Sequence, residues 1–235
     1  MSMKNRNIRI SFLWQLASFF EQSEVREENG KKIVVKNYIK PNGLIKWFLL
    51  NIPIVWFFYQ FTVDPLERMK REVNFFESYS GEVLVPKIIE KNFEKYYIKR
   101  EYIDGRVPNL KSQEDLYRVG VALGNIHNKD FCLGDTRPQN FLILNEDMAI
   151  IDAEQSTHEC KKKETKAWDL ALLFLFEFWD DPLIEPERYF ELIDAIYRGY
   201  LSSNEDVGWE EIKNIFPVIV LIPPSLLTSI KKALS

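Results

Sequence analysis

The sequence predicts an α+β fold in two lobes: a small lobe with an antiparallel sheet and one helix, and a reduced, mainly helical larger lobe. Short β-branched runs bounded by turn residues dominate the first hundred positions. Segments with helical periodicity dominate the rest. The character changes at Asp104-Gly105, which ends the strand-rich region. We therefore expect a small lobe over residues 1–103 and a larger lobe over residues 104–235.

The small lobe is predicted to contain a hairpin, a helix and two further strands. Residues 31–38 (KKIVVKNY) are rich in β-branched residues and follow a turn at Glu28-Asn29-Gly30. A helix near residues 65–80 starts with Asp64 as N-cap and Pro65 at its first position, and Gly81 is expected to end it. Residues 83–89 and 96–103 are the remaining strand candidates.

The larger lobe is predicted to hold helices over residues 113–127, 168–178 and 186–201. Two short strands, over 141–144 and 148–152, flank a turn at Asn145-Glu146-Asp147. Asp152 is expected to be the last residue of its strand, with its side chain at the edge of a cleft. Because ligands tend to bind between two such lobes, we expect the functional site at this edge.

Composition narrows the class of protein. The chain has 235 residues, 46% of them hydrophobic and 28% charged, which is typical of a folded globular protein. The net charge of −4 gives no reason to expect a nucleic-acid partner. Two cysteines, Cys132 and Cys160, and no Cys/His cluster exclude a disulfide framework and a structural zinc site. We therefore expect a protein of the reducing cytoplasm.

An aromatic stretch runs from Trp47 to Phe61 (WFLLNIPIVWFFYQF) without a charged residue. It is shorter than the roughly 20 residues of a membrane-spanning helix, and Asn51 and Pro53 interrupt it. Two interpretations remain open: a buried helix, or an interfacial surface that gives peripheral contact with the cytoplasmic membrane face.

The most informative segment is residues 133–143 (LGDTRPQNFLI), followed by residues 149–152 (AIID). Asp135 lies five residues before Asn140, and Asp152 comes twelve residues later. Phosphoryl transfer from ATP needs a base near the acceptor hydroxyl and oxygen ligands for magnesium. One carboxylate, one carboxamide and a second carboxylate can supply them. Taken alone, Asp135 and Asn140 could be turn residues around Pro138.

The order of parts along the chain is more specific than any single part. It runs through a strand lysine, a helix glutamate, an edge strand, the loop above and a later helix aspartate. A strand lysine or a helix glutamate alone is usually a solvated surface residue. In this order, they resemble the protein-kinase-like superfamily from about Lys31 to Leu201. The residues are Lys36, Glu72, Glu101-Tyr102-Ile103, Asp135, Asn140, Asp152 and Asp169.

The resemblance implies a role for each position. Lys36 would hold the α and β phosphates of ATP and pair with Glu72. The backbone of Glu101, Tyr102 and Ile103 would bond the adenine. Asp135 would accept the proton of the acceptor hydroxyl, and Arg137 would keep a positive charge near the γ-phosphate. Asn140 and Asp152 would bind Mg²⁺, and Asp169 would brace the catalytic loop. His127 is expected to be structural, and His158 an exposed loop residue.

The chain departs from the kinase pattern in several places. No glycine-rich loop precedes Lys36, and Leu133 stands where a histidine is usual. Ala153-Glu154 replaces Phe-Gly after Asp152, and Glu154 either brings a further carboxylate to the metal or faces solvent. The stretch from Asp152 to the aspartate of KAWDLALL is too short for a full activation segment. The usual peptide-docking platform is therefore expected to be absent.

Two small kinase groups fit these departures. One is the lipopolysaccharide core kinase group, which phosphorylates Kdo or heptose on a lipid-linked glycan. The segment over residues 37–72 is similar to that group's long connection between lysine and glutamate. The other is the Bud32 group of atypical serine/threonine protein kinases, whose compact helical lobe is similar to residues 166–201. We expect an ATP- and Mg²⁺-dependent phosphotransferase, with a lipid-linked core sugar preferred over a protein hydroxyl. A pseudokinase that only binds a partner is a further alternative.

Overall fold

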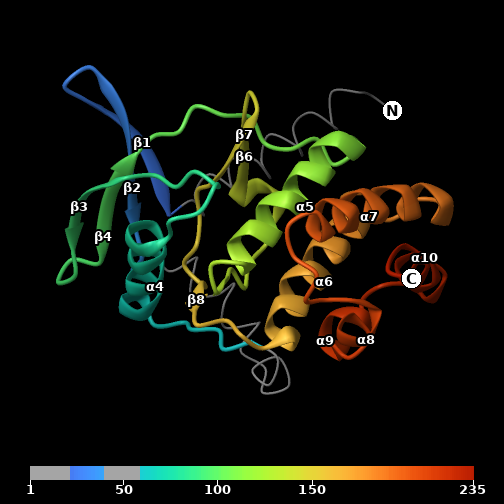
Figure 1. Cartoon of the computed structure of the whole chain (residues 1–235). Helices are drawn as coiled ribbons and strands as arrows, with labels where there is room; N and C mark the ends of the chain where they lie inside the picture. The colour runs from blue at the N-terminus through green and yellow to red at the C-terminus, as the bar shows by residue number, and fades with distance from the viewer. Residues whose placement is uncertain (1–21, 40–58) are drawn as a thin grey trace, which may run out of the picture.

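A computed structural model describes residues 22–39 and 59–235. The predicted α+β class is confirmed. Figure 1 shows a small antiparallel sheet with helix α4 beside it, and the helices α5 to α10 gathered on the other side of the molecule. The elements follow the chain order that the resemblance to the protein-kinase-like superfamily implies.

The sheet has four strands in the order β1-β2-β4-β3, all antiparallel. They are β1 (Ser23–Glu28), β2 (Lys31–Asn37), β3 (Ile88–Asn92) and β4 (Tyr97–Glu101). The predicted hairpin is confirmed, since Asn29 and Gly30 have φ values of 54° and 74°, as a tight two-residue turn requires. The strand predicted over residues 83–89 was misplaced. Leu84 makes only an isolated bridge to Ala149, and β3 begins later, at Ile88.

Helix α4 (Pro65–Ser78) begins as predicted, because the Asp64 carboxylate accepts from the backbone N–H groups of Leu66 and Glu67 at 2.7 and 3.2 Å. It ends earlier than Gly81, with Tyr79 as its C-cap. Buried Met69 and Phe75 anchor its apolar face. The helix contacts both β3 and the short strand β8 (Thr157–His158), so it links the sheet to the helical part.

The helical part is built on α5 (Gln113–His127), α6 (Lys163–Asp180) and α7 (Pro186–Leu201). The bounds of α5 and α7 are those predicted, whereas α6 starts five residues before Trp168. Helices α5 and α7 pack backbone to backbone: a Cβ on Gly120 would meet the Ile196 carbonyl at 2.0 Å. The chain ends with α8 (Trp209–Ile212), α9 (Phe216–Ile219) and α10 (Pro224–Ala233), and α10 packs on α7.

Short strands carry the loops between these helices. β6 (Phe141–Leu144) pairs with β7 (Asp147–Ile150), and β5 (Phe131–Cys132) pairs with β8. A 3₁₀ turn, η1 (Pro138–Asn140), precedes β6. The strand predicted to end at Asp152 ends two residues earlier, because the pairing of β7 stops where Ile150 meets Phe141. Asp152 therefore lies in the loop that follows.

The exclusion of a disulfide framework did not foresee a single disulfide. Cys132 and Cys160 form a disulfide with Cα atoms 5.6 Å apart. The count of two cysteines says nothing of their distance, and the pairing of β5 with β8 brings these two together.

The aromatic stretch from Trp47 lies outside the described residues up to position 58. Its last part is buried: Tyr59 is 1% and Phe61 3% exposed, and both rings pack on Trp168. In the described part of the chain, no helix combines the length and hydrophobicity needed to cross a bilayer.

Candidate functional site

Lys36 is the centre of a buried group of charges. It lies on β2, where it is 2% exposed, and its Nζ lies 2.5 Å from Oε2 of Glu72 on α4. The same Nζ lies 2.9 Å from Oδ1 of Asp152 and 3.4 Å from Oε2 of Glu154. Residues far apart in sequence, from the sheet, from α4 and from the loop after β7, thus meet at one ammonium group.

The charges explain the protonation states of this group. Burial alone would lower the pKa of Lys36, but the carboxylates of Asp152, Glu154 and Glu72 outweigh it and raise that pKa above its usual value. Burial, reinforced by the neighbouring carboxylates of Asp152 and Glu154 and opposed by Lys36, raises the pKa of Glu72 to about 7. Lys36 therefore stays charged, and Glu72 titrates near neutral pH.

Glu154 does not face solvent, so that alternative is wrong. It is 4% exposed, and its Oε2 accepts from Nη2 of the fully buried Arg68 at 2.5 Å. Arg68 also donates to Gln22 at 2.7 Å. Arg68 lies one turn before Glu72 on the same face of α4, so the spacing of four residues was a signal that sequence reasoning missed.

The loop over residues 133–140 holds Asp135, Arg137 and Asn140. The Arg137 guanidinium forms a bidentate ion pair with the Asp135 carboxylate, with Nε 3.0 Å from Oδ1 and Nη2 2.9 Å from Oδ2. The buried Asn140 donates from Nδ2 to the Asp135 carbonyl at 2.8 Å. Its own carbonyl accepts from the Ile151 N–H at 3.0 Å, which places Asn140 beside the loop that carries Asp152.

Asp169 on α6 holds this loop from below. Its carboxylate accepts from the backbone N–H groups of Leu133 and Gly134, both at 2.7 Å, and its carbonyl accepts from the Thr136 hydroxyl at 2.7 Å. Nε2 of His127 lies 3.1 Å from the same carboxylate. Asp169 is 0% exposed, so these contacts satisfy a buried charge and fix the conformation of the loop.

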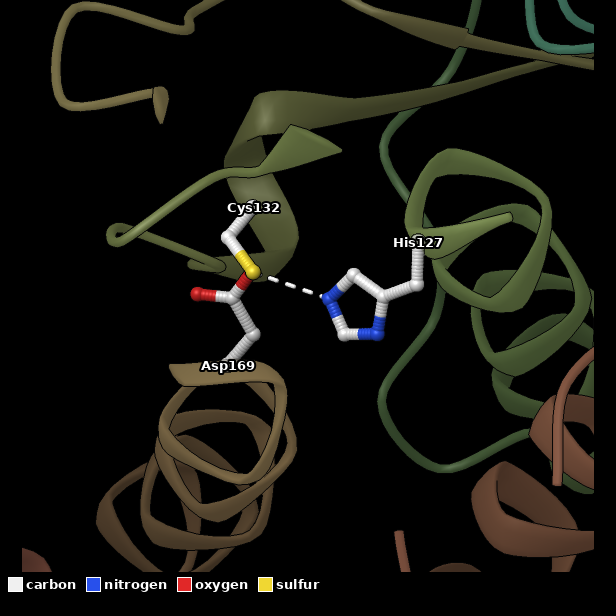
Figure 2. A group of neighbouring side chains, drawn as sticks. All are labelled: His127, Cys132 and Asp169. Carbon is white, nitrogen blue, oxygen red and sulfur yellow. Dashed lines mark hydrogen bonds and ion pairs between the residues drawn. The ribbon is translucent and has the colours of Figure 1, made fainter. Parts of the chain in front are cut away.

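His127, Cys132 and Asp169 lie close enough together to suggest a metal site, and Figure 2 shows the three side chains pointing toward one another. They do not fit one. The sulfur of Cys132 is bonded to Cys160, and the Asp169 oxygens already accept backbone N–H groups. Burial lowers the pKa of His127, whose second nitrogen contacts the Tyr200 hydroxyl at 2.9 Å. His127 is thus structural, as predicted.

A second group of metal-ligand type consists of Glu72, Asp152 and Glu154, whose carboxylate oxygens lie within 4.8 Å of one another. Magnesium prefers oxygen ligands and keeps several of its waters. Asp152 suits it best, because its side chain is 26% exposed whereas those of Glu72 and Glu154 are 0% and 5% exposed. The donor set on this side of the site therefore fits a hydrated Mg²⁺ held through Asp152.

The strand predicted to bind adenine lies next to this group, but it is not the edge strand that was predicted, because β4 pairs with β2 on one side and β3 on the other. Glu101 is the last residue of β4, and Tyr102 and Ile103 follow it, half-buried. Arg100, just before them, donates from Nη2 to the Ile151 carbonyl at 2.9 Å. The end of β4 is therefore fixed to the residue that precedes Asp152.

Comparison with known proteins gives structural likenesses only. No family model matches the chain, and no curated protein matches it. One similar solved structure is WaaP in complex with acyl carrier protein, with 13% identity over 91% of this chain and 85% of that chain and a TM-score of 0.45. Another is the bifunctional kinase-methyltransferase WbdD, with 12% identity over 85% of this chain and a TM-score of 0.43. This chain covers 47% of WbdD, about half its length.

A third similar structure is Rv3197 from Mycobacterium tuberculosis in complex with erythromycin. The two chains are 14% identical, the match spans 90% of this chain and 73% of Rv3197, and the TM-score is 0.41.

Proposed function

We propose that this chain is an ATP- and Mg²⁺-dependent kinase that transfers the γ-phosphate to a hydroxyl group. One observation carries the proposal: the Lys36 ammonium contacts Glu72 at 2.5 Å and Asp152 at 2.9 Å. A kinase must hold a phosphate-binding lysine beside a metal-binding carboxylate. A strand lysine that served only solubility would lie on the solvated face and contact neither.

The nucleotide is held by residues from both lobes. Lys36 binds the α and β phosphates, and the backbone at Glu101, Tyr102 and Ile103 bonds the adenine. Asn140 and Asp152 hold Mg²⁺, which when bound neutralises charge on the β and γ phosphates. The lobes over 1–103 and 104–235 thus form one kinase domain. The bond from Arg100 to the Ile151 carbonyl supports this assignment, because it fixes the adenine-binding strand to the metal-binding loop.

Asp135 accepts the proton of the acceptor hydroxyl. The acceptor oxygen then forms a bond to the γ-phosphorus, the bond from that phosphorus to the bridging oxygen breaks, and ADP leaves. Arg137, which lies against Asp135, keeps a positive charge where the γ-phosphate collects negative charge. Asp169 supports both roles by fixing the backbone of the loop.

The preferred acceptor is a lipid-linked lipopolysaccharide core sugar, and the alternative is a protein serine or threonine, as for the Bud32 group. The segment between Asp152 and α6 contains only the two-residue strand β8, which leaves little chain for a peptide-docking platform. A glycolipid acceptor also suits the apolar stretch from Trp47. It would place the protein in the cytoplasm, peripherally at the membrane face.

The test is transfer of labelled γ-phosphate from Mg-ATP into a host-cell extract that is afterwards separated into glycolipid and protein. The Asp135→Asn and Asp152→Ala variants, with their folds checked by circular dichroism, are the controls. Label in glycolipid that depends on both residues supports the sugar kinase, and label in protein supports the serine/threonine kinase. Label in neither fraction, with Mg-ATP still bound, would favour the pseudokinase.

Membrane contact has a separate test. The wild type should sediment with anionic vesicles, and the variant Trp56→Glu, Phe57→Glu should not, because two charges oppose insertion of an apolar surface. Gln60→Glu, which adds a charge next to the buried end of the same stretch, is the matched control. Equal sedimentation of the wild type and the double variant would reject membrane contact through this stretch.

A further inference from the structure

The disulfide between Cys132 and Cys160 encloses the proposed active-site loops. The two cysteines lie 28 residues apart, and the chain between them contains Asp135, Asn140 and Asp152. Cys132 is the last residue of β5, and Leu133, the next residue, is the first to donate its N–H to Asp169. The covalent bond is thus attached directly to the start of the braced loop.

The backbone pairing that holds the two ends together is short. β5 and β8 pair through only two residue pairs, Phe131 with His158 and Cys132 with Thr157. A two-stranded pairing of this length is marginal by itself. It is reinforced by the hydrogen bond from the Cys160 N–H to the Asp130 carbonyl at 2.9 Å and by stacking of Phe131 on His158 at 4.5 Å.

The surroundings of the two sulfurs differ. Cys132 is 0% exposed and lies against His127 and Asp169, as Figure 2 shows. Cys160 is 5% exposed and borders a hollow of about 640 Å³, which is also lined by Lys161, Lys162 and Tyr59. A thiolate attacks the sulfur that it can reach. Glu159 and Glu164 also line the hollow and balance the two lysines, so access and not charge distinguishes the two sulfurs. Cys160 is therefore the side from which the bond is opened.

We propose that Cys132 and Cys160 form a reversible redox clamp that controls the order of the loop carrying Asp135, and hence phosphate transfer. The control of transfer rests on the proposed kinase function. A cellular dithiol supplies two electrons and two protons: its thiolate attacks Cys160, Cys132 leaves and takes up a proton, and the second thiol of the reductant resolves the mixed disulfide. The products are two protein thiols and the disulfide of the reductant. In the reduced state, β8 keeps its pairing with β5 and its contacts with α4 but loses the covalent link to the braced loop, and the loop loses part of its support.

The test compares the oxidised full chain, the same chain after treatment with a dithiol, and the Cys160→Ser variant. The chain has no other cysteine, so an effect of the dithiol on the wild type that is missing in the variant comes from this bond. Alkylation after denaturation should label no cysteine in the oxidised protein and two in the reduced protein. Hydrogen exchange at the Leu133 and Gly134 amides should be about tenfold faster in the reduced protein and in Cys160→Ser, with helix α7 unchanged.

Phosphate transfer and Mg-ATP binding, measured on the same samples, separate the two proposals. A faster-exchanging loop without phosphate transfer in either state would leave the clamp intact and reject the kinase. Equal transfer and equal loop exchange in both states would leave the kinase intact and overturn the clamp. Two free thiols in protein purified in air, or faster exchange throughout the chain on reduction, would also overturn it.

Discussion

Nζ of Lys36 lies 2.5 Å from Oε2 of Glu72, and both side chains are almost completely buried. Glu72 shares this ammonium with Asp152 and Glu154, so three carboxylates surround one lysine. Arg68, which binds Glu154, brings a second positive charge to the group. The position of α4 relative to the sheet is therefore coupled to the protonation of Glu72.

Glu72 should make the stability of the fold fall as the pH rises from about 4.5 to about 7. Burial raises its pKa to about 7 from the usual 4.5, so in this window the folded protein binds a proton that the unfolded chain has released. In Glu72→Gln this slope should be absent. We expect the wild type to lose on the order of 1–3 kcal/mol relative to the variant across the window. Urea unfolding at several pH values measures this difference. If the unfolding free energy of the wild type rose with pH relative to that of the variant, the raised pKa of Glu72 would be contradicted.

Arg68 and Glu154 should show strong coupling in a double-mutant cycle. Arg68→Met leaves the buried Glu154 carboxylate with less compensation, and Glu154→Gln leaves the guanidinium without its carboxylate. Each single change should cost about 3–5 kcal/mol of unfolding free energy, and the double variant clearly less than their sum. The exposed pair of Lys91 and Glu77 is the matched control, with an expected coupling below about 1 kcal/mol. Additive costs at Arg68 and Glu154 would mean that the two charges do not stabilise each other.

Sequence reasoning reached furthest where local signals decide the structure. Helix α7 starts at Pro186 as predicted, because proline is pre-organised for the first helical position. The order of Lys36, Glu72 and Asp152 indicated one site before their contacts were known. Glu154 could not be placed, because its burial depends on Arg68 from a distant helix.

The disulfide was missed for a similar physical reason. The number of cysteines says nothing about their distance, and the pairing of two-residue strands such as β5 and β8 leaves no periodic signal. The strand beginning at Ile88 was misplaced because the preceding apolar residues serve the core and an isolated bridge to Ala149 instead of the sheet. Hydrophobic runs predict burial more reliably than pairing.

Asp169→Asn should loosen the loop at residues 133–136 without removing any proposed catalytic group. The carboxylate accepts two backbone N–H groups, and an amide would turn its own donor toward one of them. We expect a loss of about 2–4 kcal/mol in unfolding free energy and faster amide exchange at Leu133 and Gly134. Asp194→Asn, a change on the exposed side of α7 that affects an ion pair with Arg198, is the control and should cost less than about 1 kcal/mol. Unchanged exchange at the two amides would show that Asp169 does not hold the loop.

Glu177→Gln should stabilise the protein at alkaline pH. Glu177 is 2% exposed on α6, its Oε1 has no hydrogen-bond partner among the residues that the structure describes, and burial raises its pKa to about 9. The folded state therefore keeps a proton that the unfolded chain loses above pH 4.5, and stability falls as the pH rises toward 9. At pH 8 the glutamine variant should be more stable by on the order of 2–4 kcal/mol, and near pH 4.5 the advantage should vanish. Thermal unfolding at both pH values checks this. An equal shift of the unfolding temperature at both pH values would point to a cause other than the proton on Glu177.

Gly199→Ala should destabilise the protein although alanine favours a helix by about 1 kcal/mol over glycine. A Cβ at this position would lie 2.0 Å from the Tyr117 carbonyl oxygen, and the nearest atoms are backbone atoms of α5 that cannot rotate away. Helix α7 would have to move outward from α5, and the packing around buried Ile196 would be lost. We expect a cost of about 2–4 kcal/mol in urea unfolding. Gly30→Ala is the control, because Gly30 has a φ of 74° and nothing lies within 4 Å of the new Cβ. This variant has backbone strain without a clash and should cost only about 1 kcal/mol. Full stability of Gly199→Ala would mean that α5 and α7 are not in backbone contact.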